Sequence, residues 1–205
     1  QMTARDQSEI EKVITVCNWV NQQWKHHGDC PKQQNDPIGI LEAARNGSQF
    51  SCYEYSMVTA GCLNSIGIKS RIVVLLSKSV EYRNNGSYHV VAEAYLKDMK
   101  RWVMVDAQFN AVATLNNHPL SIVGVQVALA KNLSGIEFGN LNELLYEDYY
   151  RDMQFHLFFL YTPFDNRPIG PDTNHEIEGG VMLLPLGVTS GPRSFAGAPV
   201  ERFIT

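Results

Sequence analysis

Hydrophobic residues in the first third of the chain recur every three or four positions, which is the spacing of helices that bury one face. The residues between these stretches are rich in Gly, Pro, Asn, Ser and Gln, which interrupt helices. The pattern therefore predicts three helices, at Ser8–Trp24, Ile38–Ala44 and Cys52–Ile66. Ser8 and Glu11 have the spacing of a capping box, so we expect the first helix to begin there.

After the third helix, β-branched and alternating apolar residues predict a sheet. Ile68–Leu76 is expected to be one strand, and Tyr88–Leu96 with Arg101–Asp106 to form a β-hairpin. The later pattern is weaker: helices are expected at 120–131 and 141–150, strands at 153–161 and 178–186, and a loop after Gly187. Neither a repeat nor a clean linker interrupts this mixture. We therefore predict a single α+β domain over residues 1–205, with its core motifs at about 8–110.

The hairpin can be tested by its register, because opposed residues of an antiparallel pair have numbers that sum to a constant. Both a two-residue turn and a four-residue loop place Leu96 opposite Arg101, which makes this sum odd. Asp106 then lies opposite Val91, one same-face step from His89. Diagonal neighbours are about 7–8 Å apart between backbones, which an Asp–His hydrogen bond can span. The hairpin is therefore expected to bring an imidazole and a carboxylate together.

Composition narrows the class of protein. The chain has 205 residues, of which 44% are hydrophobic and 19% charged, and its net charge is −4. A chain of this length and hydrophobic content can bury one substantial core. The lack of a basic patch argues against nucleic-acid binding. No apolar run is long enough to cross a bilayer. Because the chain begins at Gln1 without Met, we expect a mature or trimmed product, exported to the cell envelope.

The four cysteines do not have the spacing of a zinc site or the density of a disulfide scaffold. Cys17 and Cys62 fall in apolar helical patterns, where a small buried thiol is expected. Cys30 lies in a polar loop and is either free or bridged to Cys17. Cys52 differs from the others because it begins a helix directly after a Gly/Ser-containing loop.

Cys52, His89 and Asp106 are the three residue types of a nucleophile, a base and an orienting carboxylate. Attack requires a thiolate, and the free amides at a helix start favour an anion there. The amide of Cys52 would also face a developing oxyanion. We therefore predict a Cys/His/Asp triad. The alternatives are a buried structural cysteine, a strand histidine and a carboxylate that only caps a strand.

Three blocks of sequence around these residues resemble the transglutaminase-like superfamily. Residues 47–56 and 65–73 are similar to its nucleophile segment, 87–95 to its His segment and 101–106 to its Asp segment. The blocks occur in family order and the resemblance covers about residues 8–110. It implies a papain-like α+β core in which the nucleophile helix packs on an antiparallel sheet that carries His and Asp. Members include protein crosslinkers, proteases, deamidases and peptide N-glycanases.

The chain departs from the animal crosslinkers in two respects. Those proteins are large and carry calcium sites, whereas this chain is short and has no calcium-loop pattern. They usually have Trp after the nucleophile, where this chain has Tyr53. The sequence is more similar to the small bacterial members, which resemble proteases or amidases.

Other residues near the triad are candidates for binding. The resemblance implies an oxyanion donor upstream of the nucleophile, for which the candidates are Trp24, Gln23 and Gln49. Tyr53, Tyr88 and Glu93 are candidates for lining the substrate cleft. Core packing is the alternative for Trp24, and a solvated or salt-bridged position is the alternative for Glu93. Tyr146, Tyr149 and Tyr150 are expected on one helix face, in the core rather than in a cleft.

We expect thiol-dependent acyl transfer on an amide bond through a Cys52 thioester. Hydrolysis is favoured over transamidation, because transamidation also needs a site that excludes water and admits an amine. The alternative is a catalytically silent domain used for binding or scaffolding. The expected substrate is a peptide, a protein or a peptidoglycan-like amide. Neither a cofactor nor a metal is expected, since His26, His27 and Cys30 match no zinc pattern.

Overall fold

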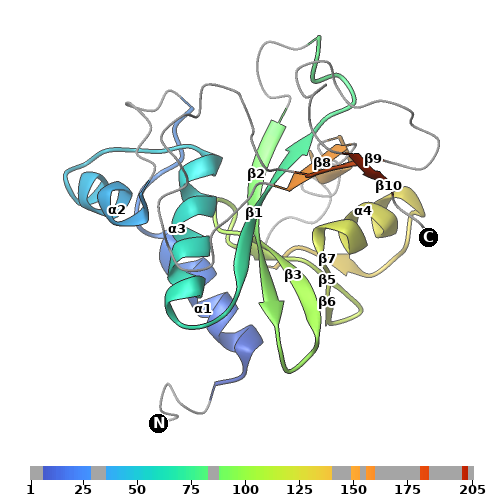
Figure 1. The fold of residues 1–205 in the computed structure, drawn as a ribbon, viewed down its shortest axis with the longest axis horizontal. Helices are drawn as coiled ribbons and strands as arrows, with labels where there is room; N and C mark the ends of the chain where they lie inside the picture. Colours follow the sequence, from blue (N-terminus) through green and yellow to red (C-terminus); the bar gives the residue numbers. More distant parts are fainter. Residues whose placement is uncertain are drawn as a thin grey trace.

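The computed structural model of the chain describes residues 7–28, 36–82, 88–139, 149–152, 156–159, 181–184 and 200–202. The helices named in these ranges are α1 (Glu9–Asn21), α2 (Pro37–Arg45), α3 (Cys52–Ser65) and α4 (Ile122–Ala130), and residues 149–152 are also helical. Figure 1 shows α1, α2 and α3 on one side of a central sheet and α4 on the other side. The expected α+β class is therefore confirmed.

The first and third helices begin and end where local chemistry dictates. Ser8 is the N-cap of α1 and forms the predicted capping box with Glu11. At the other end of α3, Gly67 has a φ of +83°, which an L side chain rarely adopts. The sequence therefore predicted these boundaries to within a few residues.

The central sheet has seven strands in the order β10-β9-β8-β1-β2-β3-β4. The bounds are β1 (Ser70–Leu76), β2 (Tyr88–Leu96), β3 (Arg101–Asp106), β4 (Ala111–Val112), β8 (His156–Phe159), β9 (Val181–Leu184) and β10 (Val200–Arg202). All neighbours are antiparallel except β9 and β10, which are parallel. A small sheet is formed by β5 (Thr114–Leu115), β6 (His118–Pro119) and β7 (Ile136–Glu137).

The hairpin of β2 and β3 has the predicted register. Leu96 pairs with Arg101 and Ala92 with Val105, so the numbers of opposed residues sum to an odd constant. One further step along this ladder puts Asp106 opposite Val91, on the face that His89 shares. The sequence rule for the hairpin is confirmed.

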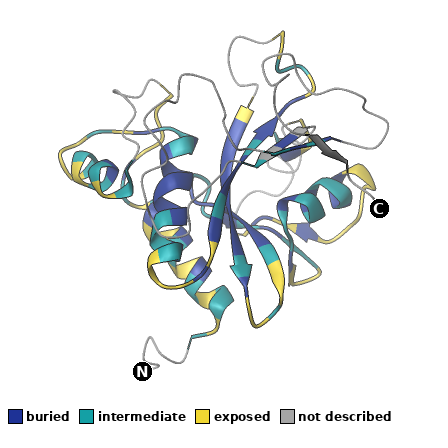
Figure 2. Cartoon of the chain, viewed as in Figure 1, coloured by how far each residue is buried: buried dark blue, intermediate teal, exposed yellow. Residues whose placement is uncertain are grey.

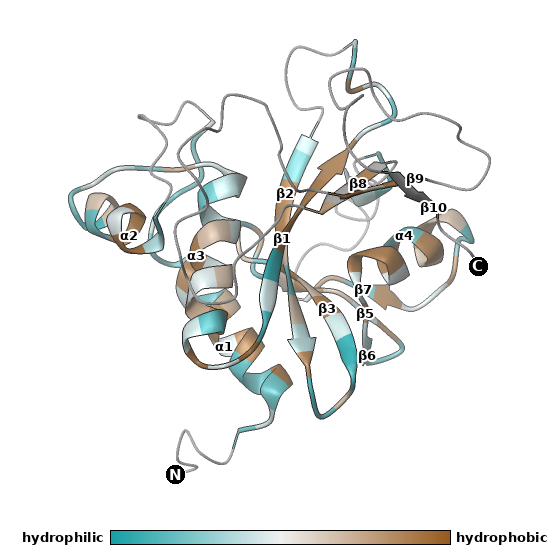
Figure 3. Ribbon diagram, in the orientation of Figure 1, coloured by the Kyte–Doolittle hydropathy of each residue, from teal (hydrophilic) through white to brown (hydrophobic). Residues whose placement is uncertain are grey.

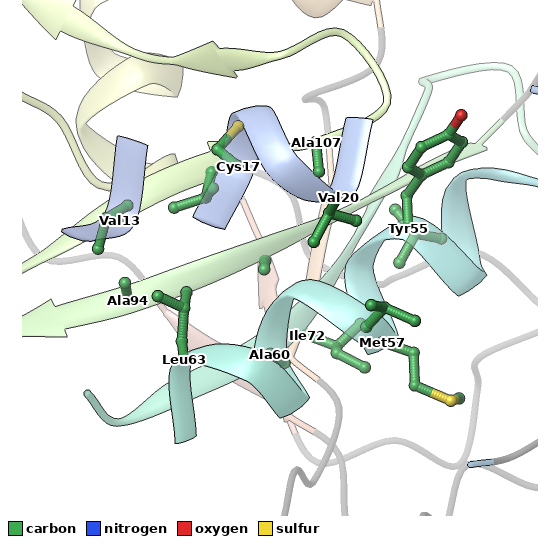
Figure 4. Close-up of a cluster of buried hydrophobic side chains, with 14 of the residues drawn as sticks. Val13, Cys17, Val20, Tyr55, Met57, Ala60, Leu63, Ile72, Ala94 and Ala107 are labelled. Atoms are coloured by element: carbon green, nitrogen blue, oxygen red, sulfur yellow. The ribbon is translucent and has the colours of Figure 1, made fainter. Parts of the chain in front are cut away.

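Hydrophobic side chains fill both faces of the sheet, as the buried residues in Figure 2 and the apolar inner surfaces in Figure 3 indicate. On one face, α1 and α3 pack against alternate residues of β2, among them Ala92 and Ala94. Figure 4 shows this cluster, with Cys17 and Val20 on α1, Leu63 on α3 and Ala94 on β2. On the other face, α4 packs against β1, β2 and β3. The sheet is thus covered on both sides, which fixes the position of its central strands.

In the second half of the chain, one expectation is wrong and another falls mostly on residues that the structure does not describe. The segment after Gly187 was expected to be a loop, but it contributes β10 to the central sheet. The short strands of the small sheet were not expected, because two-residue strands leave no periodic signal. Most of the helix expected at 141–150 lies outside the described residues. No helix in the described ranges has the length and hydropathy needed to cross a membrane.

Candidate active site

Cys52 is the first residue of α3, and the geometry of this helix start is held by a buried carboxylate. Glu54 Oε2 accepts hydrogen bonds from the backbone N–H of Ser51 at 3.1 Å and from its hydroxyl at 2.7 Å. The amides of the first helical turn have no acceptor within the helix, so they present partial positive charge around the thiol. Cys52 keeps 9% of its surface exposed, whereas Glu54 keeps 1%. The thiol therefore lies at the border between the core and solvent.

His89 and Asp106 meet as the hairpin register requires. His89 Nε2 lies 2.6 Å from Asp106 Oδ2, and both side chains are almost completely buried. Phe109 N–H approaches the other carboxylate oxygen at 3.4 Å. Because Nε2 is engaged by the carboxylate, Nδ1 is the ring nitrogen left to face another partner.

The Cys52 side chain lies near enough to this ring to affect its charge. Burial opposes a charged imidazole, but the Asp106 carboxylate and the Cys52 side chain outweigh it and raise the pKa of His89 to about 10. The imidazole is therefore held in its protonated form at neutral pH. A protonated ring beside a thiol stabilises the thiolate.

Two side chains hold the two halves of this arrangement together. Ser56 Oγ lies 2.9 Å from the carbonyl oxygen of Cys52 and 2.8 Å from that of Val90, which links the start of α3 to the strand that carries His89. Asn21, the last residue of α1, donates hydrogen bonds to the carbonyl oxygens of Ala107 and Gln108. Helices and sheet therefore fix the positions of nucleophile and base relative to each other.

Cys17 is a structural thiol in the same region. Its Sγ lies 3.7 Å from the carbonyl oxygen of Asp106 and 3.8 Å from that of Ala111. Burial, followed by the nearby charge of Asp106, raises the pKa of Cys17 far above its ordinary value. Cys17 is a free thiol, so it forms no bridge to Cys30, which lies outside the described residues. Its small buried side chain matches the expectation from sequence.

Aromatic rings enclose the far side of the imidazole. The ring centroids of Phe109 and Tyr149 each lie 5.4 Å from that of His89. Tyr150 is completely buried, and its hydroxyl donates a hydrogen bond of 2.6 Å to Asp106 Oδ2. The core position expected for Tyr150 agrees with this packing, whereas Tyr149 is only half-buried and Tyr146 lies outside the described residues. The hydrogen bond from Tyr150 to the carboxylate was not foreseen.

Of the three oxyanion candidates, Trp24 has the environment of a donor. It packs against the rings of Phe50 and Tyr55, which flank Cys52 in sequence, and keeps 8% of its surface exposed. Its Nε1 is buried and has no hydrogen-bond acceptor among the described residues. Gln49 is exposed, and Gln23 donates its amide to the Trp19 carbonyl oxygen. The indole is therefore the buried donor without a partner beside the nucleophile helix.

The sequence model of the Transglutaminase-like superfamily matches residues 1–107. This range contains Cys52, His89 and Asp106 and is just over half of the chain. The chain belongs to the Transglutaminase-like superfamily. A search of curated protein sequences finds no match.

Three solved structures are similar to part of this superfamily member. A proposed cysteine protease from Cytophaga hutchinsonii has a TM-score of 0.39 and 15% identity, covering 48% of this chain and 31% of that protein. A TGase has a TM-score of 0.37 and 18% identity, covering 50% and 27%. Calcium-bound LapG of Legionella pneumophila has a TM-score of 0.41 and 11% identity, covering 65% and 64%. The chain thus spans less than two thirds of each of these proteins.

The cleft candidates of this transglutaminase-like chain separate into two groups. Tyr88 is exposed next to His89, and Tyr53 is half-buried next to Cys52. Burial, followed by the charge of Glu54, raises the pKa of Tyr53 to about 12, so this phenol stays neutral. Both residues remain candidates for contact with a substrate.

Glu93 does not line a cleft, contrary to that expectation. Its side chain is completely buried and forms an ion pair of 2.6 Å with Arg71. Its second oxygen accepts a hydrogen bond of 2.7 Å from the backbone N–H of Ile122 at the start of α4. The carboxylate therefore joins β1, β2 and α4, which is the salt-bridged alternative.

Sequence reasoning missed two features of the site. The Ser51–Glu54 pair has the same S-x-x-E spacing as Ser8–Glu11, so the capping pattern would have found it. Tyr150 has no comparable signal, because 44 residues separate it from Asp106. Within the described residues, no cluster of three or more His, Cys, Asp or Glu side chains is arranged to hold a metal ion.

Proposed function

We propose that the chain catalyses thiol-dependent acyl transfer on an amide bond. In this proposal Cys52 is the nucleophile, His89 is the general base and acid, and Asp106 orients the imidazole. The observation that carries the proposal is the 2.6 Å contact between His89 Nε2 and Asp106 Oδ2, with the Cys52 side chain near enough to the same ring to affect its charge. Membership of a family of thiol enzymes supports it.

In the acylation step, the thiolate attacks, two N–H groups stabilise the oxyanion and the imidazolium donates a proton. The Cys52 thiolate attacks the carbonyl carbon of the amide, so a C–S bond forms and the carbonyl oxygen becomes an oxyanion. The Cys52 N–H and the indole N–H of Trp24 are the proposed donors to that oxygen. The His89 imidazolium then gives its proton to the amide nitrogen, the C–N bond breaks and the amine leaves. The product is a Cys52 thioester beside a neutral imidazole.

The second step returns the site to its first state. A water molecule gives a proton to the neutral imidazole of His89 while its oxygen attacks the thioester carbon. The C–S bond breaks, which releases a carboxylic acid and restores the thiolate–imidazolium pair. An amine in place of water would give transamidation. Hydrolysis is the simpler outcome, because the site then needs no second organic substrate.

A peptide, a protein or a peptidoglycan-like amide is the proposed substrate class. Tyr53 and Tyr88, beside the nucleophile and the base, are the proposed contacts to its side chains or backbone. Aromatic side chains suit this task because they combine apolar area with a polar tip.

Burial of the triad favours a second candidate, a catalytically silent domain used for binding. His89 and Asp106 each keep 1% of their surface exposed, and Cys52 keeps 9%. A site closed to substrate would retain the same contacts without turnover. The two candidates differ in whether a reagent reaches the thiol.

Alkylation with iodoacetamide at pH 6–7 distinguishes the two candidates. We expect Cys52 to react at least about tenfold faster than a free cysteine peptide, because its thiolate is stabilised by the imidazolium. His89→Gln should abolish this excess. Cys62, which is half-buried and has its pKa raised by burial, is an internal control that should react slowly in the same sample.

A second experiment tests turnover of a substrate. Wild type and Cys52→Ala are compared on a library of peptides and muropeptides, with and without an added amine. Release of carboxylate by wild type alone supports hydrolysis, and incorporation of the amine supports transamidation. A Cys52 that reacts no faster than the free peptide would contradict catalysis and favour the silent domain.

A further inference from the structure

Tyr150 lies in the half of the chain that the family match does not cover, yet it contacts the triad carboxylate. Its hydroxyl donates to Asp106 Oδ2 at 2.6 Å, the same oxygen that accepts from His89 Nε2. The tyrosine keeps 0% of its surface exposed, so water cannot replace this donor. A buried carboxylate needs such donors, because burial penalises an ion that is not fully hydrogen-bonded.

The surroundings of Tyr150 hold its ring rigidly. The ring stacks on Phe138, with 4.6 Å between centroids and 26° between the planes. The next residue, Arg151, donates hydrogen bonds to the carbonyl oxygen of Leu129 and to Asn132 Oδ1 at the end of α4. A cation at this position also suits the negative end of a helix. Tyr150 is therefore fixed by α4 and by the segment that follows β7.

We propose that Tyr150 is a positioning residue of the active site, which holds the Asp106 carboxylate in the orientation that His89 requires. The proposal rests on the proposed function of Cys52 and His89. It assigns a task to the second half of the chain, which completes the site instead of only covering the sheet. Because its hydroxyl is bonded to Asp106 Oδ2, Tyr150 acts through the carboxylate.

The phenol is suited to this task because it stays protonated. Burial, the charge of Asp106 and the hydrogen bond to it all raise the pKa of Tyr150 well above its ordinary value. The hydroxyl is thus a permanent donor. With the hydroxyl removed, Asp106 Oδ2 would keep one strong partner instead of two, and both the carboxylate and the imidazole would sample other orientations.

Tyr150→Phe tests the proposal, because it keeps the ring on Phe138 and deletes the hydroxyl alone. We expect the rate of Cys52 alkylation by iodoacetamide at pH 6–7 to fall by about tenfold, the size of one hydrogen bond to a charged group. At pH 10 the difference should vanish, because a thiol of ordinary pKa, about 8.5, is then ionised without help. A loss of packing alone would not depend on pH in this way.

Tyr95→Phe is the matched control. Tyr95 lies on β2 with His89, packs its ring against Trp102 and is half-buried, so the same chemical change there should leave alkylation unchanged. If wild type is reactive and His89→Gln is not, but Tyr150→Phe equals wild type at every pH, the positioning role is wrong and the proposed function stands. If wild type itself is unreactive, the proposed function fails first.

A second variant covers the case in which Tyr150→Phe does not fold. Arg151→Ala leaves the tyrosine intact but removes its attachment to the end of α4. We expect a smaller loss of Cys52 alkylation, again confined to low pH. Equal rates for Arg151→Ala and wild type across the whole pH range would overturn the proposal.

Discussion

The indole of Trp24 has an apolar environment and a buried N–H without an acceptor among the described residues. An unpaired buried donor is costly, about 1–3 kcal/mol, so it is expected where a ligand or a reacting atom supplies the missing partner. This argues for a donor to the oxyanion rather than for a core aromatic alone.

Trp24→Phe should therefore affect two reactions of the Cys52 thiol differently, amide turnover and alkylation. Turnover of an amide that wild type cleaves should fall by about 100-fold or more, because one oxyanion donor is lost. Alkylation of Cys52 should change little, because that reaction forms no oxyanion. Trp19→Phe, on the exposed side of α1, is the control and should alter neither rate. A parallel fall of both rates in Trp24→Phe would show that the indole acts through packing.

At the scale of elements, the start of α3 determines where the nucleophile sits. Two capping boxes of the same S-x-x-E form occur in this chain, one exposed at Ser8–Glu11 and one at Ser51–Glu54 whose carboxylate is almost fully buried. Because buried hydrogen bonds to a charged group are not replaced by water, the second box should matter more.

We predict that Glu54→Ala lowers the free energy of unfolding by about 1–2 kcal/mol or more. The loss should come with slower alkylation of Cys52, since the first turn of α3 carries the thiol. Glu11→Ala removes the equivalent cap from α1 and should cost less, without an effect on Cys52. Urea unfolding measures the loss of unfolding free energy in both variants, provided that its dependence on urea concentration is the same as in wild type. Equal losses for the two would mean that the burial of Glu54 adds nothing.

At the scale of the whole molecule, the sequence predicted what local signals encode. Helix periodicity, the capping box at Ser8 and the odd register of the hairpin rest on neighbouring residues, and each is confirmed. The positions of His89 and Asp106 followed from that register. Their catalytic roles and that of Cys52 stay predictions.

The remaining features depend on contacts between distant residues. Glu93 was a cleft candidate because it shares a strand face with His89, but Arg71 and the start of α4 cover that face. β7 pairs with β5, and β10 pairs with β9, across longer stretches of the chain, whereas β5 and β6 are neighbours but too short to show a periodic pattern. Tyr150 reaches Asp106 through the same long-range packing. No short motif specifies such a contact.

Stability against pH reports on the proton that the folded molecule holds at His89. The raised pKa of His89, about 10, means that the folded state keeps this proton while the unfolded chain, with an ordinary imidazole near 6.5, loses it. The free energy of unfolding contributed by His89 is therefore fully present below about pH 6.5 and is lost as pH rises toward 10.

His89→Gln removes this proton-binding group. We expect the free energy of unfolding of wild type to fall between pH 7 and 9 with a slope of up to about 1.4 kcal/mol per pH unit, and that of His89→Gln to fall less steeply. Urea unfolding at several pH values measures both slopes. His89→Gln should keep any slope from Cys17, whose raised pKa acts in the same direction at the upper end of this range. Equal slopes in wild type and His89→Gln would mean that the folded molecule holds no extra proton at His89, so the protonated imidazole on which the proposed chemistry depends would be absent.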